Sequence, residues 1–458
     1  MDHFDAIIIG AGQAGPSLAA RLATAGQRTA LIERHLFGGT CVNTGCIPTK
    51  TLIASARAAY QARRAGDYGV TIDGAITVDM PAVKARKDAV AGTDNDRIPQ
   101  WMADMDHLTA IQGHARFRDA HTIEVDGTPI RGERIFINVG GRARVPDMPG
   151  LDTVDYLTNS SMMDVDYLPE HLVIVGGSYI GLEFGQMYRR FGSRVTIVEK
   201  GDRLIAKEDP AVSEAVREIL EAEGIAIRCD AECIGVKPRD GGVAVDVECA
   251  DGPPEIDGSH LLLAVGRVPN THDLGLENAG IARDERGYIT VDDRLRTSQS
   301  HVWALGDCNG RGAFTHTAYN DFQIVAANLL DAANRSVADR IPCYALYTDP
   351  PLGRIGQTVS QVRESGRPAL VGHLPMSKVG RAREMGETHG FMSVVVDADS
   401  KAILGAAILG VRGDEVVQGL LDAMYAGAPF TTVRDAMHIH PTVAELIPTL
   451  LDNLEPLE

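Results

Sequence analysis

Two cysteines, Cys41 and Cys46, stand five positions apart in residues 38–50, a segment rich in glycine and threonine. A close pair of thiols can take up two electrons as a disulfide and return them as two thiols. In an ideal helix, positions five apart differ by about 7.5 Å along the axis, whereas a disulfide needs Cα atoms within about 7 Å. Gly45 and Pro48 are suited to the departure from helical geometry that a bridge requires. Two free structural thiols are the alternative for an isolated pair at this spacing.

Length and composition are those of an ordinary folded, multidomain chain. The 458 residues are 44% hydrophobic and 23% charged, as in soluble globular proteins, and they are enough for roughly two to four domains. No apolar run approaches the roughly 20 residues of a membrane-spanning helix. The net charge of −18 argues against nucleic acid or an anionic membrane surface as a partner.

The first residues and the cysteine content indicate a reducing compartment. The apolar run Ala6–Ile9 is short and lacks a basic leader, which predicts a buried strand and not a signal peptide. An odd, sparse set of cysteines fits a cytoplasmic protein, in which a stable bridge is more often catalytic than structural. Cys229 and Cys233 lack a second cysteine or histidine pair at matching spacing, so we expect buried small residues and no metal site. The seven cysteines are Cys41, Cys46, Cys229, Cys233, Cys249, Cys308 and Cys343.

A pattern of strand, glycine turn, helix, strand and acid occurs twice. The first glycine precedes the acid by the same number of positions in both copies (10 to 33 and 176 to 199). Such glycines let the backbone approach a pyrophosphate at a helix N-terminus, and the acid accepts hydrogen bonds from ribose hydroxyls. Two copies therefore predict two Rossmann units. The residues are Gly10, Gly12, Gly15 and Glu33 in the first copy, and Gly176, Ser178, Gly181 and Glu199 in the second.

The predicted elements around these residues follow the same order in both copies. The first copy has strands over Ala6–Ile9 and Arg28–Ile32 with a helix over Pro16–Thr24, and the second has strands over Leu172–Val175 and Arg194–Val198. Three further apolar strands each reach a glycine. They are Ile135–Gly141, Leu261–Arg267 with Gly266, and Val302–Asp307 with Gly306. An acid at the carboxyl end of a parallel strand faces the ligand crevice, which makes Asp307 a candidate contact.

The last third of the chain has a different pattern. Helical periodicity over Ala318–Leu330 is followed by an expected linker, Asp331–Arg340. Beyond it, strands and helices alternate irregularly, which predicts a separate α+β domain. The expected strands are Phe391–Val396 and Ala402–Leu409, and the expected helices are Glu415–Tyr425 and Val443–Leu451.

These motifs together resemble the class I pyridine nucleotide–disulfide oxidoreductases, in order along essentially the whole chain. The motifs are Gly39–Lys50, both glycine patterns, Gly306–Asp307 and His438–Glu445. The resemblance implies an α/β fold with two interleaved Rossmann-like domains, for FAD and for NAD(P), and a C-terminal α+β dimerisation domain. The implied domains are 1–148 and 266–335 for FAD, 149–265 for NAD(P), and 341–458 for dimerisation. The active site would be complete only in a homodimer.

The resemblance also assigns roles to individual residues. Lys50 lies near the flavin N5 edge and pairs with Glu183, and Tyr179 covers the nicotinamide pocket. His440 and Glu445 match the acid–base pair that the partner subunit supplies. The implied FAD contacts are Gly10, Gly12, Gly15, Glu33, Lys50, Gly306 and Asp307. The implied NAD(P) contacts are Gly176, Ser178, Tyr179, Gly181, Glu199 and Gly266.

The implied reaction carries electrons from NAD(P)H through FAD to the disulfide, entering at Cys46, the sulfur nearer the ring. Cys41 is then freed to attack the substrate, while His440 exchanges a proton and Glu445 orients the imidazole. Independent physical arguments agree for Lys50, since a cation one helical turn from Cys46 favours its thiolate. Without the resemblance, His440 before a proline would be interpreted as a surface or packing residue.

Residues 46–52, 177–183 and 380–384 are most similar to mercuric-reductase-like enzymes, and among them to the reactive-chlorine-resistance flavoprotein reductases. Mercuric reductases carry a cysteine pair near the C-terminus, whereas the last cysteine here is Cys343. We therefore expect a small acceptor that is another metal ion or a disulfide. Dihydrolipoamide dehydrogenase is the main alternative, and a non-enzymatic nucleotide-binding redox sensor is the alternative from another class.

The coenzyme is expected to be NADH, with NADPH as the alternative. Glu199 at the ribose position would repel a 2′-phosphate. Arg194, Lys200 and Arg203 are close enough in sequence to offset that repulsion.

Overall fold

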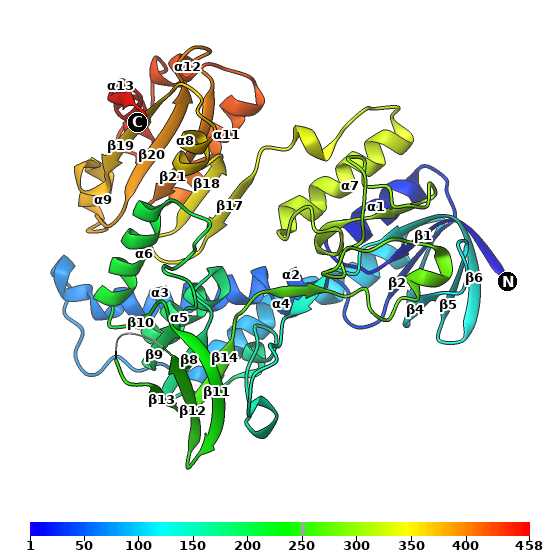
Figure 1. The fold of residues 1–458 in the computed structure, drawn as a ribbon, viewed down its shortest axis with the longest axis horizontal. Coiled ribbons are helices and arrows are strands. Elements are labelled where there is room, and N and C mark those ends of the chain that lie inside the picture. Colours follow the sequence, from blue (N-terminus) through cyan, green and yellow to red (C-terminus); the bar gives the residue numbers. More distant parts are fainter. Residues whose placement is uncertain (249–251) are drawn as a thin grey trace.

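Three units make up the chain, and they are coloured in Figure 1 blue and cyan for the first, green for the second, and orange and red for the third. The computed structural model describes residues 1–248 and 252–458, so Cys249 lies outside the described residues. The last stretch of the first unit returns in yellow-green after the second unit, so the two are interleaved along the chain. Within the described residues, no helix is long and apolar enough to cross a membrane.

The first unit is a seven-stranded sheet whose central strands run parallel. Ala6–Ile9 is almost completely buried, as expected for a parallel strand covered on both faces. The parallel strands, in spatial order, are β3 (Leu108–Gln112), β2 (Thr29–Glu33), β1 (Asp2–Ile9) and β6 (Thr128–Ile137), with β16 (Val302–Ala304) also beside β6. The antiparallel edge is β5 (Thr122–Val125) and β4 (Ala115–Phe117). Helices α1 (Ala14–Thr24) and α7 (Thr315–Leu330) contact each other and contribute to one apolar core with this sheet.

The second unit repeats the parallel arrangement on a smaller scale. Its four parallel strands, in order, are β10 (Ala226–Arg228), β9 (Arg194–Val198), β8 (His171–Val175) and β14 (His260–Leu263). Helices α5 (Tyr179–Phe191) and α6 (Pro210–Ala222) connect these strands. An antiparallel layer adds β11 (Glu232–Arg239), β12 (Gly242–Glu248) and β13 (Glu255–Gly258).

The chain passes between the two units on a pair of short antiparallel strands. The outgoing strand β7 (Gly141–Ala143) pairs with the returning strand β15 (Arg267–Pro269). The backbone N–H of Arg144 also donates to the carbonyl of Gly266 at 2.9 Å. The inserted unit therefore begins and ends at adjacent points.

The third unit is a six-stranded antiparallel sheet flanked by short helices. Its strands, in spatial order, are β17 (Cys343–Leu346), β18 (Leu352–Gly356), β21 (Ile403–Leu409), β20 (Phe391–Asp397), β19 (Ala369–Pro375) and β22 (Leu454–Pro456). Its helices are α8 (Val359–Glu364), α9 (Gly380–Glu384), α10 (Gly413–Val416), α11 (Gln418–Tyr425), α12 (Phe430–Arg434) and α13 (Ile447–Asp452). Strands β20 and β21 are buried along their whole length and form the core with these helices.

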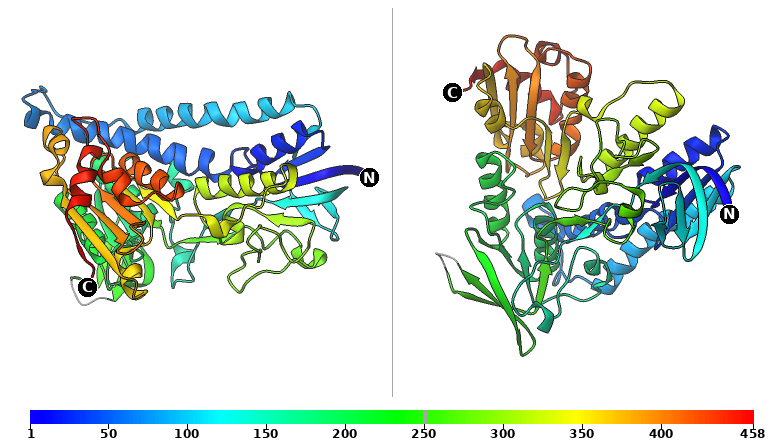
Figure 2. Two further views of the ribbon diagram at one scale, coloured as in Figure 1. Left: turned by 90° about the horizontal axis from the view of Figure 1, so that it is seen from above. Right: turned by 45° about the vertical axis from the view of Figure 1, so that its right-hand side comes forward.

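Two long helices run along one side of the molecule, as the left view of Figure 2 shows. They are α3 (Cys46–Arg63) and α4 (Met80–Ala103), and α3 also contacts α5 of the second unit. Asp349 of the third unit joins these parts, because its carboxylate pairs with Arg57 of α3 and with Arg190 of α5. The three units are thus tied together around the helix that begins at Cys46.

The predicted strands and helices are confirmed to within a few residues, including the two strands of the third unit. The exceptions are β6, which begins at Thr128, well before the predicted strand, and the two helices predicted in the third unit. The predicted helix over 415–425 is two helices, because the carbonyl of Val417 accepts from both Leu420 and Leu421 at the junction. The predicted helix over 443–451 begins as a 3₁₀ turn, and α13 starts at Ile447 with Pro448 in its first turn, where a missing N–H costs little.

Candidate active site

A cavity of about 1920 Å³ runs between the two Rossmann units and past Cys41 and Cys46. A typical small-molecule pocket holds roughly 300–1,000 Å³, so this cavity has room for more than one nucleotide. The predicted residues that line it are Gly10, Gly12, Glu33, Cys41, Cys46, Lys50, Ser178, Tyr179, Glu183, Glu199, Gly266, Gly306 and Asp307. The predicted residues outside its lining are Gly15, Gly176, Gly181, His440 and Glu445.

The first glycine turn fits a pyrophosphate closely. A Cβ on Gly10, whose φ is +104°, would lie 2.3 Å from the carbonyl oxygen of Asn138, and one on Gly15 would lie 2.2 Å from the carbonyl oxygen of Gly10. At Gly12 the nearest atom would be 3.4 Å away, in ordinary contact. Gly10 and Gly15 therefore fix the turn, and Gly12 leaves its outer side open toward the cavity. The first N–H groups of α1 have no side-chain cap, which favours an anion at this helix end, and among them that of Gly15 donates to the carbonyl of Gly12 at 2.9 Å.

The second turn has the same construction with one substitution. A Cβ on Gly176 would lie 2.4 Å from the carbonyl oxygen of Ala264, and one on Gly181 would lie 2.0 Å from the carbonyl oxygen of Gly176. Ser178 stands at the open middle position and adopts an extended backbone, φ −110° and ψ −174°. A side chain fits at this position, which corresponds to the uncrowded Gly12 of the first copy.

The acids at the ends of β2 and β9 are held by equivalent hydrogen bonds. Each carboxylate accepts from the N–H that follows the first glycine of its own copy and from the N–H two residues after itself. For Glu33 the donors are Ala11 at 2.9 Å and His35 at 2.8 Å, and for Glu199 they are Gly177 at 2.6 Å and Gly201 at 2.8 Å. Because a carboxylate has about four acceptor positions, both acids keep capacity for a ribose.

The redox segment is a broken helix. Helix α2 (Gly39–Asn43) ends before Thr44, and α3 begins at Cys46. A Cβ on Gly45 would lie 2.8 Å from the carbonyl oxygen of Thr40, so the break needs glycine at this position. Pro48 plays no part in the break, contrary to the expectation from the sequence, because it lies in the first turn of α3, where proline is tolerated.

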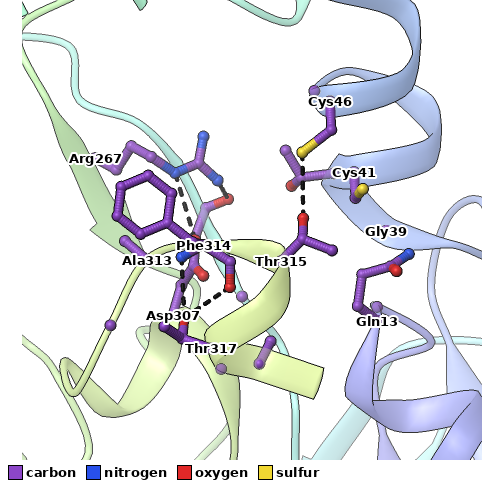
Figure 3. Close-up of a pocket in the computed structure, with 18 of the residues that line it drawn as sticks. Gln13, Gly39, Cys41, Cys46, Arg267, Asp307, Ala313, Phe314, Thr315 and Thr317 are labelled. Carbon is purple, nitrogen blue, oxygen red and sulfur yellow. Dashed lines mark hydrogen bonds and ion pairs between the residues drawn. The ribbon is translucent and has the colours of Figure 1, made fainter. Parts of the chain in front are cut away.

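Cys46 is the more acidic of the two thiols. Both are free, and the sulfur of Cys46 lies 3.2 Å from the hydroxyl oxygen of Thr315, at the start of α7. Figure 3 shows the Cys46 sulfur and the Thr315 hydroxyl facing each other. A hydrogen bond from Cys41, helped by Thr315 and the charge of Lys50, lowers the pKa of Cys46 to about 6. The same hydrogen bond to Cys46 raises the pKa of Cys41.

Lys50 joins α3 to α5 next to these thiols. Its ammonium donates to Glu183 at 2.6 Å and lies 4.7 Å from the ring centroid of Tyr347. The other carboxylate oxygen of Glu183 accepts from the N–H of Tyr347 at 3.0 Å. The predicted pairing of Lys50 with Glu183 is therefore present, and residues of all three units hold it in place.

Asp307 enters the cavity from a short 3₁₀ turn, Gly306–Asn309, after β16. Its carboxylate lies 3.6 Å from the guanidinium of Arg267, and Figure 3 shows the two side chains close together. Burial raises the pKa of Asp307, and Arg267 opposes that rise. A partly buried carboxylate that lines the cavity is suited to accept hydrogen bonds from ligand hydroxyl groups.

His440 and Glu445 form a pair away from this cavity. The Nδ1 atom of His440 lies 2.9 Å from Glu445, while the histidine side chain is 81% exposed. The neighbouring Met437 and Ile439 are 99% and 79% exposed. The oriented imidazole of His440 and the side chains of Met437 and Ile439 therefore lie exposed on the surface of the chain, outside its own cavity.

Residues 4–321 match the family described as pyridine nucleotide-disulphide oxidoreductase, and residues 343–451 match the dimerisation domain of that family. The chain belongs to this family. It is accordingly an oxidoreductase of a family that binds FAD and a pyridine nucleotide. The two glycine turns, the hydrogen-bonded carboxylates of Glu33 and Glu199, and the carboxylate of Asp307 fit such ligands.

Three similar proteins span nearly the whole chain. The probable pyridine nucleotide-disulfide oxidoreductase RclA of Escherichia coli K12 is 37% identical, with 97% of this chain and 98% of the relative covered. Dihydrolipoyl dehydrogenase of Haloferax volcanii is 34% identical, with 98% and 95% covered. Mercuric reductase of Bacillus cereus is 33% identical, with 96% and 70% covered. A solved Cu(II) complex of RclA, an HOCl-induced flavoprotein disulfide reductase from Escherichia coli, matches with a TM-score of 0.90 at 36% identity, over 99% of both chains.

Sequence reasoning missed several residues that complete the site. Thr315 contacts Cys46 across 269 positions of sequence, and Asn138 donates to the carbonyls of Gly10 and Gly12. Phe314 and Tyr344 stack against each other beside Tyr179. None belongs to a spaced motif. The position of Thr315 shortly after Gly306–Asp307, near the start of a predicted helix, was the one available signal.

Proposed function

We propose that this chain is a homodimeric, NADH-preferring flavoprotein reductase that passes two electrons through Cys46 and Cys41 to a small acceptor, a metal ion or a disulfide. The observation that carries the proposal is the position of the acidic thiol Cys46, between the two glycine turns and beside Lys50 and Thr315. A pair of thiols that merely packed would not need a lowered pKa on one of its two sulfurs.

In the proposed reaction, Cys46, Cys41 and His440 each have a separate role. FAD, when bound, supplies the two-electron transfer from the pyridine nucleotide to the neighbouring disulfide. Opening the disulfide leaves Cys46 as the thiolate and Cys41 as the thiol that takes up a proton. Cys41 then gives its proton to His440 of the partner subunit and attacks one sulfur of an acceptor disulfide. The other sulfur leaves and takes that proton, and Cys46 displaces the reduced acceptor by closing the bridge to Cys41.

A metal-ion acceptor is supported by the relatives. A mercuric reductase and a Cu(II) complex of RclA are among the similar proteins, and thiolates are good ligands for soft metal ions. A dihydrolipoamide dehydrogenase is the second candidate, because the Haloferax volcanii enzyme of that name is similar over almost its whole length.

The acceptor is tested with a panel at fixed NADH: lipoamide, glutathione disulfide, mercuric and cupric ions, and quinones. We expect turnover with a metal ion or a small disulfide. Cys41→Ser should lower that turnover by at least about 100-fold, a conservative bound for loss of a covalent nucleophile, while NADH still bleaches the flavin. Cys229→Ser, outside the cavity, is the matched control. Undiminished reduction of the acceptor by Cys41→Ser would rule out the dithiol route.

The preference for NADH is supported by the charges around Glu199. Arg194 begins β9 and so lies at the opposite end of the strand from Glu199. Lys200 pairs with Glu232 at 2.6 Å, and Arg203 pairs with Asp202 at 3.1 Å. Each of the three basic residues considered from the sequence is therefore either distant from Glu199 or already in an ion pair with another carboxylate.

We expect the KM for NADPH to exceed that for NADH by about tenfold or more, since a like-charge contact costs upward of about 1.4 kcal/mol. Steady-state kinetics with both coenzymes measures the ratio. Glu199→Gln should lower the ratio of the KM for NADPH to the KM for NADH, and Arg194→Gln should leave this ratio unchanged. A lower KM for NADPH than for NADH in the unmodified enzyme would contradict the assignment.

A further inference from the structure

A fully buried ion pair lies directly behind the tyrosine at the start of α5. The side chain of Glu208 is 0% exposed and that of Arg354 is 2% exposed. One oxygen of Glu208 accepts from two nitrogens of Arg354, at 2.9 Å and 2.7 Å. Arg354 also donates to Asp209 at 2.8 Å, and Asp209 accepts from the N–H groups at the start of α8. The orientation of Glu208 is therefore fixed from several directions.

The other oxygen of Glu208 faces two phenol groups at unequal distances. Tyr344 donates to it at 2.6 Å, whereas the hydroxyl of Tyr179 lies 3.5 Å away. The first distance is that of a strong bond to a charged acceptor, and the second is at the limit of a hydrogen bond. Tyr344 is thus firmly held, while Tyr179 is held weakly and can leave without disturbing the ion pair.

Tyr179 lines the cavity, as do Phe314 and Tyr344, whereas Glu208 does not. The Tyr179 ring meets Phe314 edge-on at 6.3 Å and Tyr344 edge-on at 5.6 Å. Phe314 stacks on Tyr344 at 5.5 Å. These aromatic neighbours limit the directions in which the Tyr179 ring can move, and in its resting position the Tyr179 hydroxyl lies 3.5 Å from Glu208.

We propose that Glu208 is a positioning residue that holds Tyr179 in its resting place, and that Tyr344 weakens this hold by competing for the same carboxylate oxygen. The inference rests on the proposed function and on the role that the resemblance implies for Tyr179, which covers the nicotinamide pocket, so that NADH binds there only when the Tyr179 ring moves aside. The strength of the Tyr179–Glu208 contact then contributes to the apparent affinity for NADH. Glu208 acts through Tyr179 and does not touch the nucleotide.

The arrangement predicts opposite effects for two similar substitutions. Tyr179→Phe removes the contact, so the Kd for NADH should fall by about threefold, the value of a weak hydrogen bond. Tyr344→Phe keeps the stacked ring but frees the oxygen for Tyr179, so the Kd should rise by about threefold. In the Tyr179→Phe background, Tyr344→Phe should have no effect on the Kd.

A second pair of variants separates positioning from packing. Glu208→Gln should lower the Kd for NADH as Tyr179→Phe does, because a neutral amide holds the phenol less strongly. Asp209→Asn changes the other carboxylate of Arg354, which does not contact Tyr179, and should therefore shift the Kd much less than Glu208→Gln does. Thermal melting of the two variants is the companion measurement, since a purely structural role would lower the stability of both alike.

The measurement is anaerobic stopped-flow reduction of the FAD-loaded enzyme over a range of NADH concentrations, with Tyr167→Phe, outside the cavity, as the control. Opposite shifts that vanish in the double variant support the inference. Shifts of the same sign, no shift, or additive shifts overturn it, as does a loss of thermal stability without any change in Kd. If NADH does not reduce the flavin of the unmodified enzyme, the proposed function itself fails.

Discussion

The acidity of Cys46 depends on side chains from three different elements. Cys41 comes from α2, Lys50 from the second turn of α3, and Thr315 from the first residue of α7. The cysteines and Lys50 belong to one short segment, so their proximity could be predicted from the sequence. Thr315 could not, because its place depends on the packing of α7 against the first sheet.

Thr315→Ala should raise the pKa of Cys46 above its value of about 6. A hydroxyl that donates to a thiolate stabilises the charged form, so its loss favours the thiol, by up to about one pKa unit for one hydrogen bond. The fraction of thiolate between about pH 6 and 7 should therefore fall. The pH dependence of Cys46 alkylation by iodoacetamide in the reduced enzyme, followed by mass spectrometry, measures this. Thr315→Ser keeps the hydroxyl and should restore the original profile; an unchanged profile in Thr315→Ala would show that the contact has no influence.

At the scale of elements, the two Rossmann units agree down to single hydrogen bonds. The repeat, its strands and its acids could be predicted because local spacing determines them. The roles of the glycines could not be separated from the spacing alone. Gly15 and Gly181 pack helix on turn outside the cavity, whereas the middle position is open enough for Gly12 in one copy and Ser178 in the other.

Gly181→Ala should therefore be much more harmful than Ser178→Gly. A methyl group on Gly181 would lie 2.0 Å from the carbonyl oxygen of Gly176, and overpacking of this kind costs about 1–3 kcal/mol. We expect a lower thermal melting temperature and weaker NADH binding for Gly181→Ala. Ser178→Gly should change the melting temperature and the affinity for NADH only slightly. Equal tolerance of the two substitutions would contradict the packing role.

At the scale of the whole molecule, the chain carries its redox pair and its imidazole at separate places. His440 and Glu445 contact each other but do not line the cavity that contains Cys41 and Cys46. The resemblance implied both their pairing and their supply by the partner subunit, and the structure shows the pair outside the cavity of its own chain. The ion pairs of Asp349 with Arg57 and Arg190, which join the three units, were beyond prediction, since they connect residues far apart in sequence and belong to no motif.

Mixing two inactive variants tests the proposed sharing between subunits. Cys41→Ser and His440→Gln chains, each inactive alone, should regain about a quarter of the unmodified activity when random mixing produces mixed dimers. In a mixed dimer, one site has both an intact redox pair and an intact imidazole. Activity after co-refolding or coexpression, with each variant alone as the control, measures the recovery. No recovery despite mixed dimers would place both groups of an active site on the same chain.

The adjacent ends of the inserted unit have a further consequence for engineering. Since β7 and β15 lie side by side, the segment between them can in principle be cut out and its flanks joined by a short linker, leaving the first sheet unbroken. The same geometry makes the segment a cassette that could be exchanged for one with another coenzyme specificity.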